Sequence, residues 1–136
     1  DEDGLGAEVQ RLSAGRARIV GYTHAPERYM AAADLLCLPS YREGFGAVVI
    51  EAAAVGLPAI GSRIYGIVDA VQDGKTGLLF EAGKVGELQA CLRRLLGDAA
   101  MREHLGTAAR ARALAEFAEE RLVGALEARY REILGG

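Results

Sequence analysis

The fold is decided by residues 34–62, which read DLLCLPSYREGFGAVVIEAAAVGLPAIGS. Asp34–Leu38 is apolar after its first residue and does not alternate, which favours a strand buried on both faces, as in a parallel sheet. Pro39–Phe45 contains proline and glycine and is expected to form a loop. Gly46–Val55 is predicted to be a helix, and Ala59–Ser62 is predicted to be a second strand. The stretch therefore predicts a strand, a loop, a helix and a strand in succession.

The same alternation extends on both sides of this stretch. Arg18–Tyr22 and Leu78–Phe80 are short runs typical of strands. Pro26 fits the first turn of a helix within Thr23–Ala33, because its missing N–H is not needed there. Further helical segments are expected at Ala7–Ala14 and Gly66–Val71. Four short strands alternating with helices indicate a parallel sheet with helices on both faces, joined by right-handed crossovers.

From Lys84 onward the pattern is helical only. The first helix carries one apolar stripe, made of Val85, Leu88, Cys91, Leu92, Leu95 and Leu96. Gly97 and Asp98 interrupt it, and two further helices are expected over Ala99–Ala115 and Glu116–Leu134. The fold class is therefore α/β, with a helical tail at residues 99–136.

Composition and charge narrow the functional class. The chain has 136 residues, 51% hydrophobic and 26% charged, so one domain over residues 1–136 can bury a core. Its net charge of −3 gives no electrostatic reason to expect nucleic acid as a partner. No apolar run approaches the ~18 residues of a membrane-spanning helix. Cys37 and Cys91 are far apart in the chain, so no metal site or disulfide framework is expected, and a reducing cytoplasm is indicated.

The loop and helix at residues 39–55 are suited to binding an anion. A helix N-terminus offers free N–H groups and a partial positive charge. Gly44 and Gly46 carry no side chain that would block a ligand, and phosphate or diphosphate is the natural occupant. In parallel sheets, ligands bind beyond the carboxyl ends of the strands, where this loop is expected to lie.

Two glutamates, Glu43 and Glu51, lie on either side of this helix start. A carboxylate in so apolar a segment is costly to bury unless hydroxyls or positive charge meet it. Neither carboxylate suits phosphate, because like charges repel, but both suit hydroxyl groups, which donate strong hydrogen bonds to ionised oxygens. A ligand with hydroxyls at both ends and a diphosphate in the middle is a nucleotide sugar.

The segment PSYREGFGAVVIEAAAVGLPAI closely resembles the E-x7-E region of retaining glycosyltransferases that have two Rossmann-like domains, the GT-B fold. The resemblance continues through RIVGY, ADLLCLPS, SRIYGIVDAVQDGKTGLLF and the helical tail. Ser62–Val71 is most similar to bacterial enzymes that extend lipid-linked or cell-surface glycans. The resemblance implies that residues 1–136 are a nucleotide-sugar-binding C-terminal domain, with a Rossmann-like sheet that is incomplete at its N-terminus.

The resemblance also implies a role for individual residues. Glu43 is the implied catalytic residue, contacting hydroxyls of the donor sugar and supporting an oxocarbenium-like transition state. Glu51 would accept hydrogen bonds from ribose hydroxyls, and Gly21 and Tyr22 would lie near the nucleobase. The backbone N–H groups of Gly44, Phe45 and Gly46 would face the sugar and the diphosphate. The implied donor-binding residues are Gly21, Tyr22, Pro39, Ser40, Gly44, Phe45, Gly46 and Glu51.

By the same resemblance, other parts of the enzyme would precede Asp1: an Arg and a Lys that clamp the diphosphate, and the acceptor-binding domain. Asp69 stands where many relatives have Glu. The complete protein is expected to transfer a sugar from a UDP-sugar to a glycan or polyprenyl-linked acceptor, with retention and without metal or cofactor. A cytoplasmic site at the inner face of the plasma membrane is expected. The 136-residue piece alone should bind donor weakly, transfer nothing and tend to self-associate.

Two other functions stay open from the sequence. One is a nucleotide-sugar epimerase of the same architecture, and the other is a non-catalytic nucleotide-binding module. A dehydrogenase is disfavoured, because no G-x-G-x-x-G follows a strand. Each of these residues also has a purely structural interpretation. Glu43 can be a solvated loop carboxylate, Glu51 can lie on the solvent face of a helix, and Gly44 and Gly46 can be simple turn residues.

Overall fold

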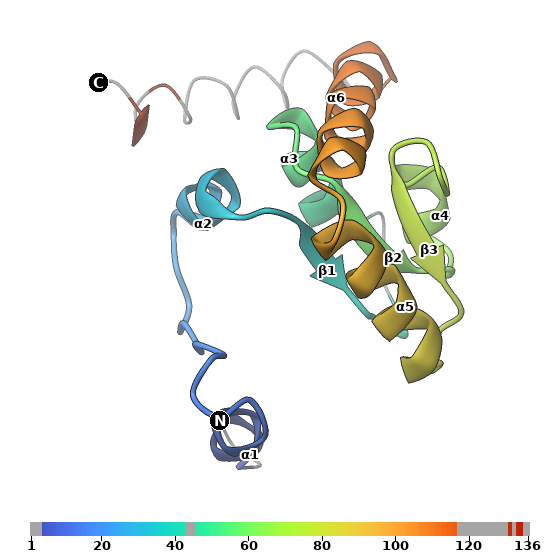
Figure 1. Cartoon of the computed structure of the whole chain (residues 1–136). Helices are drawn as coiled ribbons and strands as arrows, with labels where there is room; N and C mark the ends of the chain where they lie inside the picture. Colours follow the sequence, from blue (N-terminus) through green and yellow to red (C-terminus); the bar gives the residue numbers. More distant parts are fainter. Residues whose placement is uncertain (1–3, 43–45, 117–130, 132, 135–136) are drawn as a thin grey trace.

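The computed structural model describes residues 4–42, 46–116, 131 and 133–134. Strands and helices alternate through the middle of the chain, and helices alone follow the last strand (Figure 1). The elements are α1 (Leu5–Leu12), α2 (Pro26–Ala32), β1 (Leu36–Leu38), α3 (Ala47–Ala54), β2 (Ala59–Ser62), α4 (Ile67–Ala70), β3 (Gly77–Phe80), α5 (Val85–Leu96) and α6 (Ala99–Glu116).

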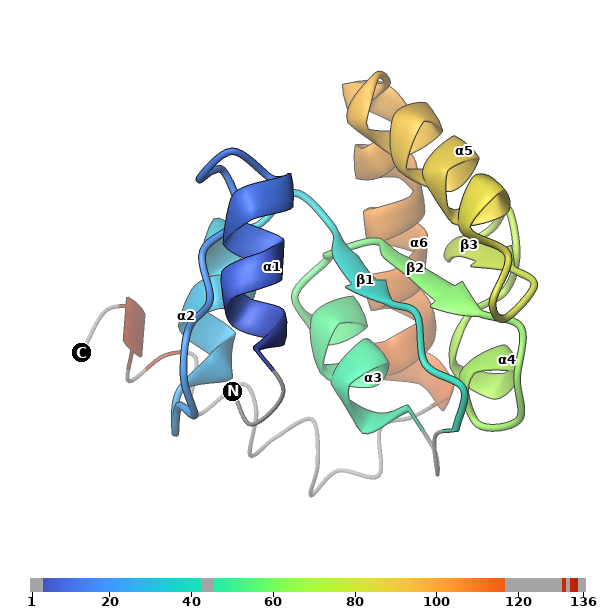
Figure 2. The ribbon, with the colours of Figure 1, turned by 90° about the horizontal axis from the view of Figure 1, so that it is seen from below.

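The three strands form one parallel sheet in the order β1-β2-β3. Ile60 of β2 lies opposite Cys37 of β1 on one side and Leu78 of β3 on the other. Helices cover both faces of the sheet, with α3 and α4 on one side and α5 on the other (Figure 2). The predicted α/β class with a Rossmann-like parallel sheet is therefore confirmed.

The sheet packs against its helices through two apolar cores, one on each face. On one face, Ile50 of α3 and Ile67 of α4 are fully buried against Ala59. On the other face, Ile60 and Leu78 pack with Leu95 of α5, together with Phe80 and Leu105. Complete burial of a side chain of this size contributes roughly 1.5–3 kcal/mol of transfer free energy. These residues hold the three strands and their helices as one body.

Helix α6 crosses from the α5 core to the end of α3, where small residues allow close contact. A Cβ atom on Gly106 would overlap the carbonyl oxygen of Gly56, in the turn after α3. Ala53, Ala109 and Ala113 form a small cluster beside this contact. In addition, Arg112 Nη2 of α6 donates to the Asp69 carbonyl of α4 at 2.8 Å. Helix α6 therefore links α3 to α4.

The predicted strand at Arg18–Tyr22 is not a strand in the structure. Ile19 and Val20 are 55% and 42% exposed, and this segment lies in the linker between α1 and α2, apart from the sheet (Figure 1). A strand requires a neighbour for its N–H and C=O groups, and no described residue pairs with this run. A composition typical of strands therefore does not make Arg18–Tyr22 a strand when no neighbouring strand pairs with it.

Burial differs from expectation at two further elements. Strand β1 is half-buried rather than buried on both faces, because it is an edge strand of the described sheet. In α5, Leu95 is fully buried and Leu88, Cys91 and Leu92 pack partly against the core, but Val85 and Leu96 are 75% and 60% exposed. The helix predicted over Glu116–Leu134 cannot be compared in the same way, because most of its residues lie outside the described part of the chain. None of the described helices is long and apolar enough to cross a membrane.

Candidate functional site

The candidate site lies at the carboxyl edge of the sheet. Because the three strands are parallel, the loops that follow them emerge at this edge. These loops include residues 39–42 after β1, 63–66 after β2 and 81–84 after β3. Helix α3 begins after the first of these loops, as the sequence predicts (Figure 2).

Gly46 sets the start of α3. It has φ 67° and ψ 39°, a left-handed conformation that glycine adopts without strain. A Cβ atom there would lie 3.3 Å from the Gly66 carbonyl oxygen and 3.5 Å from Ala70 Cβ, so glycine also permits the close approach of α4. Gly46 itself is buried, whereas Ala47 is exposed. The first residue of the helix therefore reaches the surface.

The electrostatics of this helix start favour an anion. No side chain of the described residues is found to cap it, and its first turn contains no acidic residue. The first N–H groups of a helix have no acceptor within the helix and carry a partial positive charge. A diphosphate is the chemical group that uses both properties.

Glu51 lies five residues after Gly46 on the same helix, which corresponds to about 7.5 Å along the axis at 1.5 Å per residue. Its neighbours Ile50 and Ala52 are fully buried. Glu51 itself is half-buried and has an interaction partner within the protein. It is therefore not a freely solvated side chain.

Four of the other predicted donor-binding residues lie in two parts of the described structure. Pro39 and Ser40 follow β1 at the carboxyl edge, with Pro39 exposed and Ser40 half-buried. Gly21 and Tyr22 lie in the linker between α1 and α2, where Tyr22 is 89% exposed and stacks edge-on with His24. This linker lies on the β1 side of the molecule, away from β3, in both views (Figures 1 and 2). Glu43, Gly44 and Phe45 lie outside the described residues, so their roles stay predictions.

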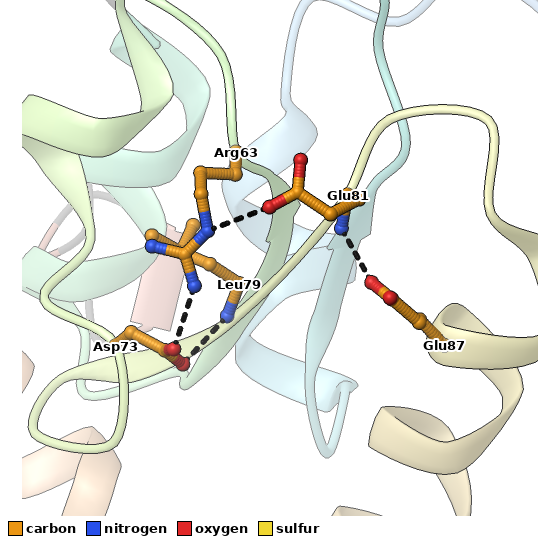
Figure 3. Close-up of polar contacts among 5 residues, drawn as sticks. All are labelled: Arg63, Asp73, Leu79, Glu81 and Glu87. Atoms are coloured by element: carbon orange, nitrogen blue, oxygen red, sulfur yellow. Dashed lines mark hydrogen bonds and ion pairs between the residues drawn. The ribbon is translucent and has the colours of Figure 1, made fainter.

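A polar network at the same edge was not found by sequence reasoning (Figure 3). Arg63, just after β2, pairs with Asp73 at 2.9 Å and with Glu81 at 3.2 Å. The second oxygen of Asp73 accepts from the Leu79 N–H at 2.9 Å, and the Arg63 N–H donates to the Phe80 carbonyl at 2.7 Å. The turn motif around Asp73 was visible in the sequence, but its pairing with a residue ten positions earlier was not.

This network joins the loop after β2 to β3 and to the loop that follows it. The Glu81 N–H donates to Glu87 of α5 at 2.8 Å, which extends the connection to the next helix (Figure 3). Both carboxylates and the guanidinium are more than 40% exposed, so each ion pair contributes at most about 1 kcal/mol. The main effect of the network is to restrain the loop at residues 63–66.

The two cysteines are half-buried, Cys37 on β1 and Cys91 on α5, and neither lies in the loops of this edge. Burial, the larger cause, and the nearby Cys91 raise the pKa of the Cys37 thiol on β1. Burial likewise raises the pKa of Cys91 on α5, with a further contribution from the charge of Asp73. Both cysteines are free thiols. In the part of the chain that the structure describes, no cluster of three or more His, Cys, Asp or Glu residues could hold a metal ion.

Comparison with solved structures finds the same architecture elsewhere. Sucrose-phosphate synthase from Thermosynechococcus elongatus matches with a TM-score of 0.81 and 33% identity, over 96% of this chain and 33% of that chain. Anabaena HepE in complex with UDP matches with a TM-score of 0.80 and 26% identity, over 98% of this chain and 36% of that chain.

Comparison of sequences finds relatives that match this chain over about three quarters of its length. N-acetyl-alpha-D-glucosaminyl L-malate synthase from Bacillus anthracis is 36% identical over 105 residues, covering 77% of this chain and 28% of the relative. D-inositol 3-phosphate glycosyltransferase from Mycobacterium bovis is 40% identical over 105 residues, covering 76% and 22%. The chain thus spans about a quarter of the length of these curated relatives. The family described as glycosyl transferases group 1 matches residues 8–112, and the chain belongs to this family.

Proposed function

We propose that the complete protein transfers a sugar from a nucleotide diphosphate sugar, with a UDP-sugar as the donor, to a glycan or polyprenyl-linked acceptor with retention. The chain described above forms the donor-binding part. The observation that carries this proposal is the start of α3, where the helix begins at the carboxyl edge of the sheet with Gly46 as its N-cap and with no side-chain cap among the described residues. Membership of the glycosyltransferase family supports the reaction class.

The arrangement suggests how the donor is held. The diphosphate accepts hydrogen bonds from the first N–H groups of α3, with no repelling carboxylate in its first turn. Glu51, further along the helix, accepts hydrogen bonds from the ribose hydroxyls. Anabaena HepE, whose structures contain UDP alone and UDP with glucose, supports a nucleotide-sugar ligand for this architecture.

The chemistry follows from this placement. The bond between the anomeric carbon and the diphosphate oxygen breaks, a bond from the anomeric carbon to the acceptor oxygen forms, and the acceptor hydroxyl gives its proton to the leaving diphosphate. Negative charge builds up on the leaving diphosphate, and N–H groups aimed at it stabilise the transition state. Glu43 is proposed to stabilise positive charge at the anomeric carbon, with the acceptor attacking from the face that the diphosphate leaves.

The remaining parts of the proposal concern the setting of the reaction. No metal or cofactor is proposed, because the helix start and basic side chains neutralise the diphosphate. The acceptor binds to a part of the protein that precedes this chain. The 136-residue chain by itself binds donor weakly and transfers nothing. We place the enzyme in the cytoplasm, at the inner face of the plasma membrane.

The decisive experiment is a transfer assay with the complete protein and its Glu43→Ala variant. We expect the variant to lose nearly all transfer while it still binds UDP in titration calorimetry, because the diphosphate contacts lie elsewhere. Wild-type turnover by the variant would contradict the role of Glu43. Epimerised sugar formed without any acceptor would instead indicate an epimerase, and UDP binding without either reaction would indicate a binding module.

A further inference from the structure

The loop at residues 63–66 is held in place on both sides of a single exposed tyrosine. On one side, Arg63 makes the two ion pairs described above. On the other side, Gly66 is buried, and its carbonyl oxygen approaches the start of α3 at Gly46. The Ile64 N–H donates to the Ser62 carbonyl at 2.9 Å, which tightens the turn.

Tyr65 sits between these restraints, yet its side chain is 82% exposed. Isolated exposed aromatic residues are common on protein surfaces, and exposure alone would carry no argument. Here, however, the residues on either side are fixed, so the ring is presented from a restrained backbone. It belongs to the same loop as Gly66, whose carbonyl oxygen lies near the α3 N-cap, where the diphosphate is proposed to bind.

A second tyrosine at the same edge shows the contrast. Tyr41, after β1, is 74% exposed, but its hydroxyl oxygen and ring lie 3.5–3.6 Å from the position that a Cβ atom on Gly83 would take. The Tyr41 ring thus rests against the loop after β3. Tyr65 is the more exposed of the two tyrosines, at 82% against 74%.

The surroundings of Tyr65 favour a sugar ring over a nucleobase. A sugar presents apolar C–H groups on one face and hydroxyl groups at its rim, so it needs an aromatic face together with carboxylate acceptors. Asp69, four residues after Tyr65 and in the first turn of α4, has an exposed side chain. Arg63, the nearest basic residue along the chain, is already paired with Asp73 and Glu81.

The geometry points to Tyr65 as a specificity-determining residue that packs against the transferred sugar of the donor. This inference rests on the proposed function, because the position of the sugar follows from the diphosphate at the start of α3. Tyr65 takes no part in the bond changes. Its ring adds affinity for the nucleotide sugar and none for the nucleoside diphosphate that lacks the sugar.

The test compares two ligands that differ only in the sugar. Titration calorimetry of the complete protein would use UDP with UDP-glucose, and in parallel GDP with GDP-mannose. For the pair that binds, we expect Tyr65→Ala to weaken nucleotide-sugar binding roughly fivefold, the size of one aromatic contact. Nucleoside diphosphate binding should stay unchanged, and Tyr65→Phe should keep the wild-type affinity for both ligands.

Tyr29→Ala is the matched control, since Tyr29 is a half-exposed tyrosine on α2; it should leave both affinities unchanged. A thermal unfolding curve of Tyr65→Ala that overlays the wild type would exclude a folding defect. Equal weakening of both ligands, or no change in either, would overturn the role of Tyr65 while leaving the donor site intact. If the wild type bound none of the four ligands, the proposed function and this inference would both be wrong.

Discussion

The linker between α1 and α2 and the loop between β2 and α4 both carry predicted or proposed ligand contacts, but they differ in how they are held. The loop at residues 63–66 is restrained by the ion pairs of Arg63 and by contact with the α3 N-cap. The linker contains the run Arg18–Tyr22, which forms no strand and exposes Ile19. The difference shows that distant residues position the loop, whereas Arg18–Tyr22 forms no strand because it has no strand partner among the described residues.

The largest expected effect compares one residue type in these two regions. Ile67→Ala removes a fully buried side chain beside the anchored loop, and we expect it to lower the free energy of unfolding by about 3 kcal/mol. Ile19→Ala removes a side chain that is 55% exposed in the linker, and its effect should stay within about 0.5 kcal/mol. Urea unfolding of the chain measures both. A large loss for Ile19→Ala would show that the linker has a packing partner after all.

The second effect concerns the contact that joins α6 to α3. Gly106→Ala forces a Cβ atom onto the Gly56 carbonyl oxygen, so α6 must shift, and we expect a loss of about 2 kcal/mol in urea unfolding. Gly86→Ala is the matched control within a helix, because a Cβ atom there meets no atom within 4 Å. That variant should gain up to about 1 kcal/mol from helix propensity. Equal stability of the two variants would contradict close packing of α6.

The third effect tests the network of Figure 3. Arg63→Gln removes two exposed ion pairs, and we expect a loss of about 0.5–1 kcal/mol that shrinks in 1 M salt because exposed charges are screened. Arg18→Gln in the linker, where no ion pair of Arg18 is found among the described residues, should change stability by less and without a salt dependence. A loss for Arg63→Gln that is the same in low and high salt would point to packing rather than charge.

The smallest effect concerns the half-buried thiol of Cys37. Burial raises the pKa of Cys37, so folding disfavours its thiolate. The resulting stability is present below the ordinary thiol pKa and is lost as the pH rises through the higher pKa of the folded state. At pH 8, iodoacetamide should therefore alkylate Cys37 more slowly in the folded chain than in urea. An added cysteine at the exposed linker position, Arg18→Cys, should react equally fast under both conditions, and a fast reaction of folded Cys37 would contradict its burial.

Much of the local structure could be predicted from the sequence. Pro26 begins a helix, Gly46 precedes one, and the runs at residues 59–62 and 77–80 form strands, because each depends on neighbours in the chain. The family was also recognisable from consecutive residues around the two glutamates. The roles of Glu43 and Glu51 stay predictions, because they depend on a bound ligand.

What the sequence by itself determined is the alternation of strands and helices, the glycine at the start of α3 and the family to which the chain belongs. Only the tertiary structure decided that Arg18–Tyr22 is not a strand, that Arg63 meets Asp73 and Glu81, and that Gly106 packs on Gly56. The physical reason is the range of the interactions. Helix starts and turns depend on residues a few positions apart, whereas strand pairing, ion pairs and helix contacts join residues that only the folded chain brings together.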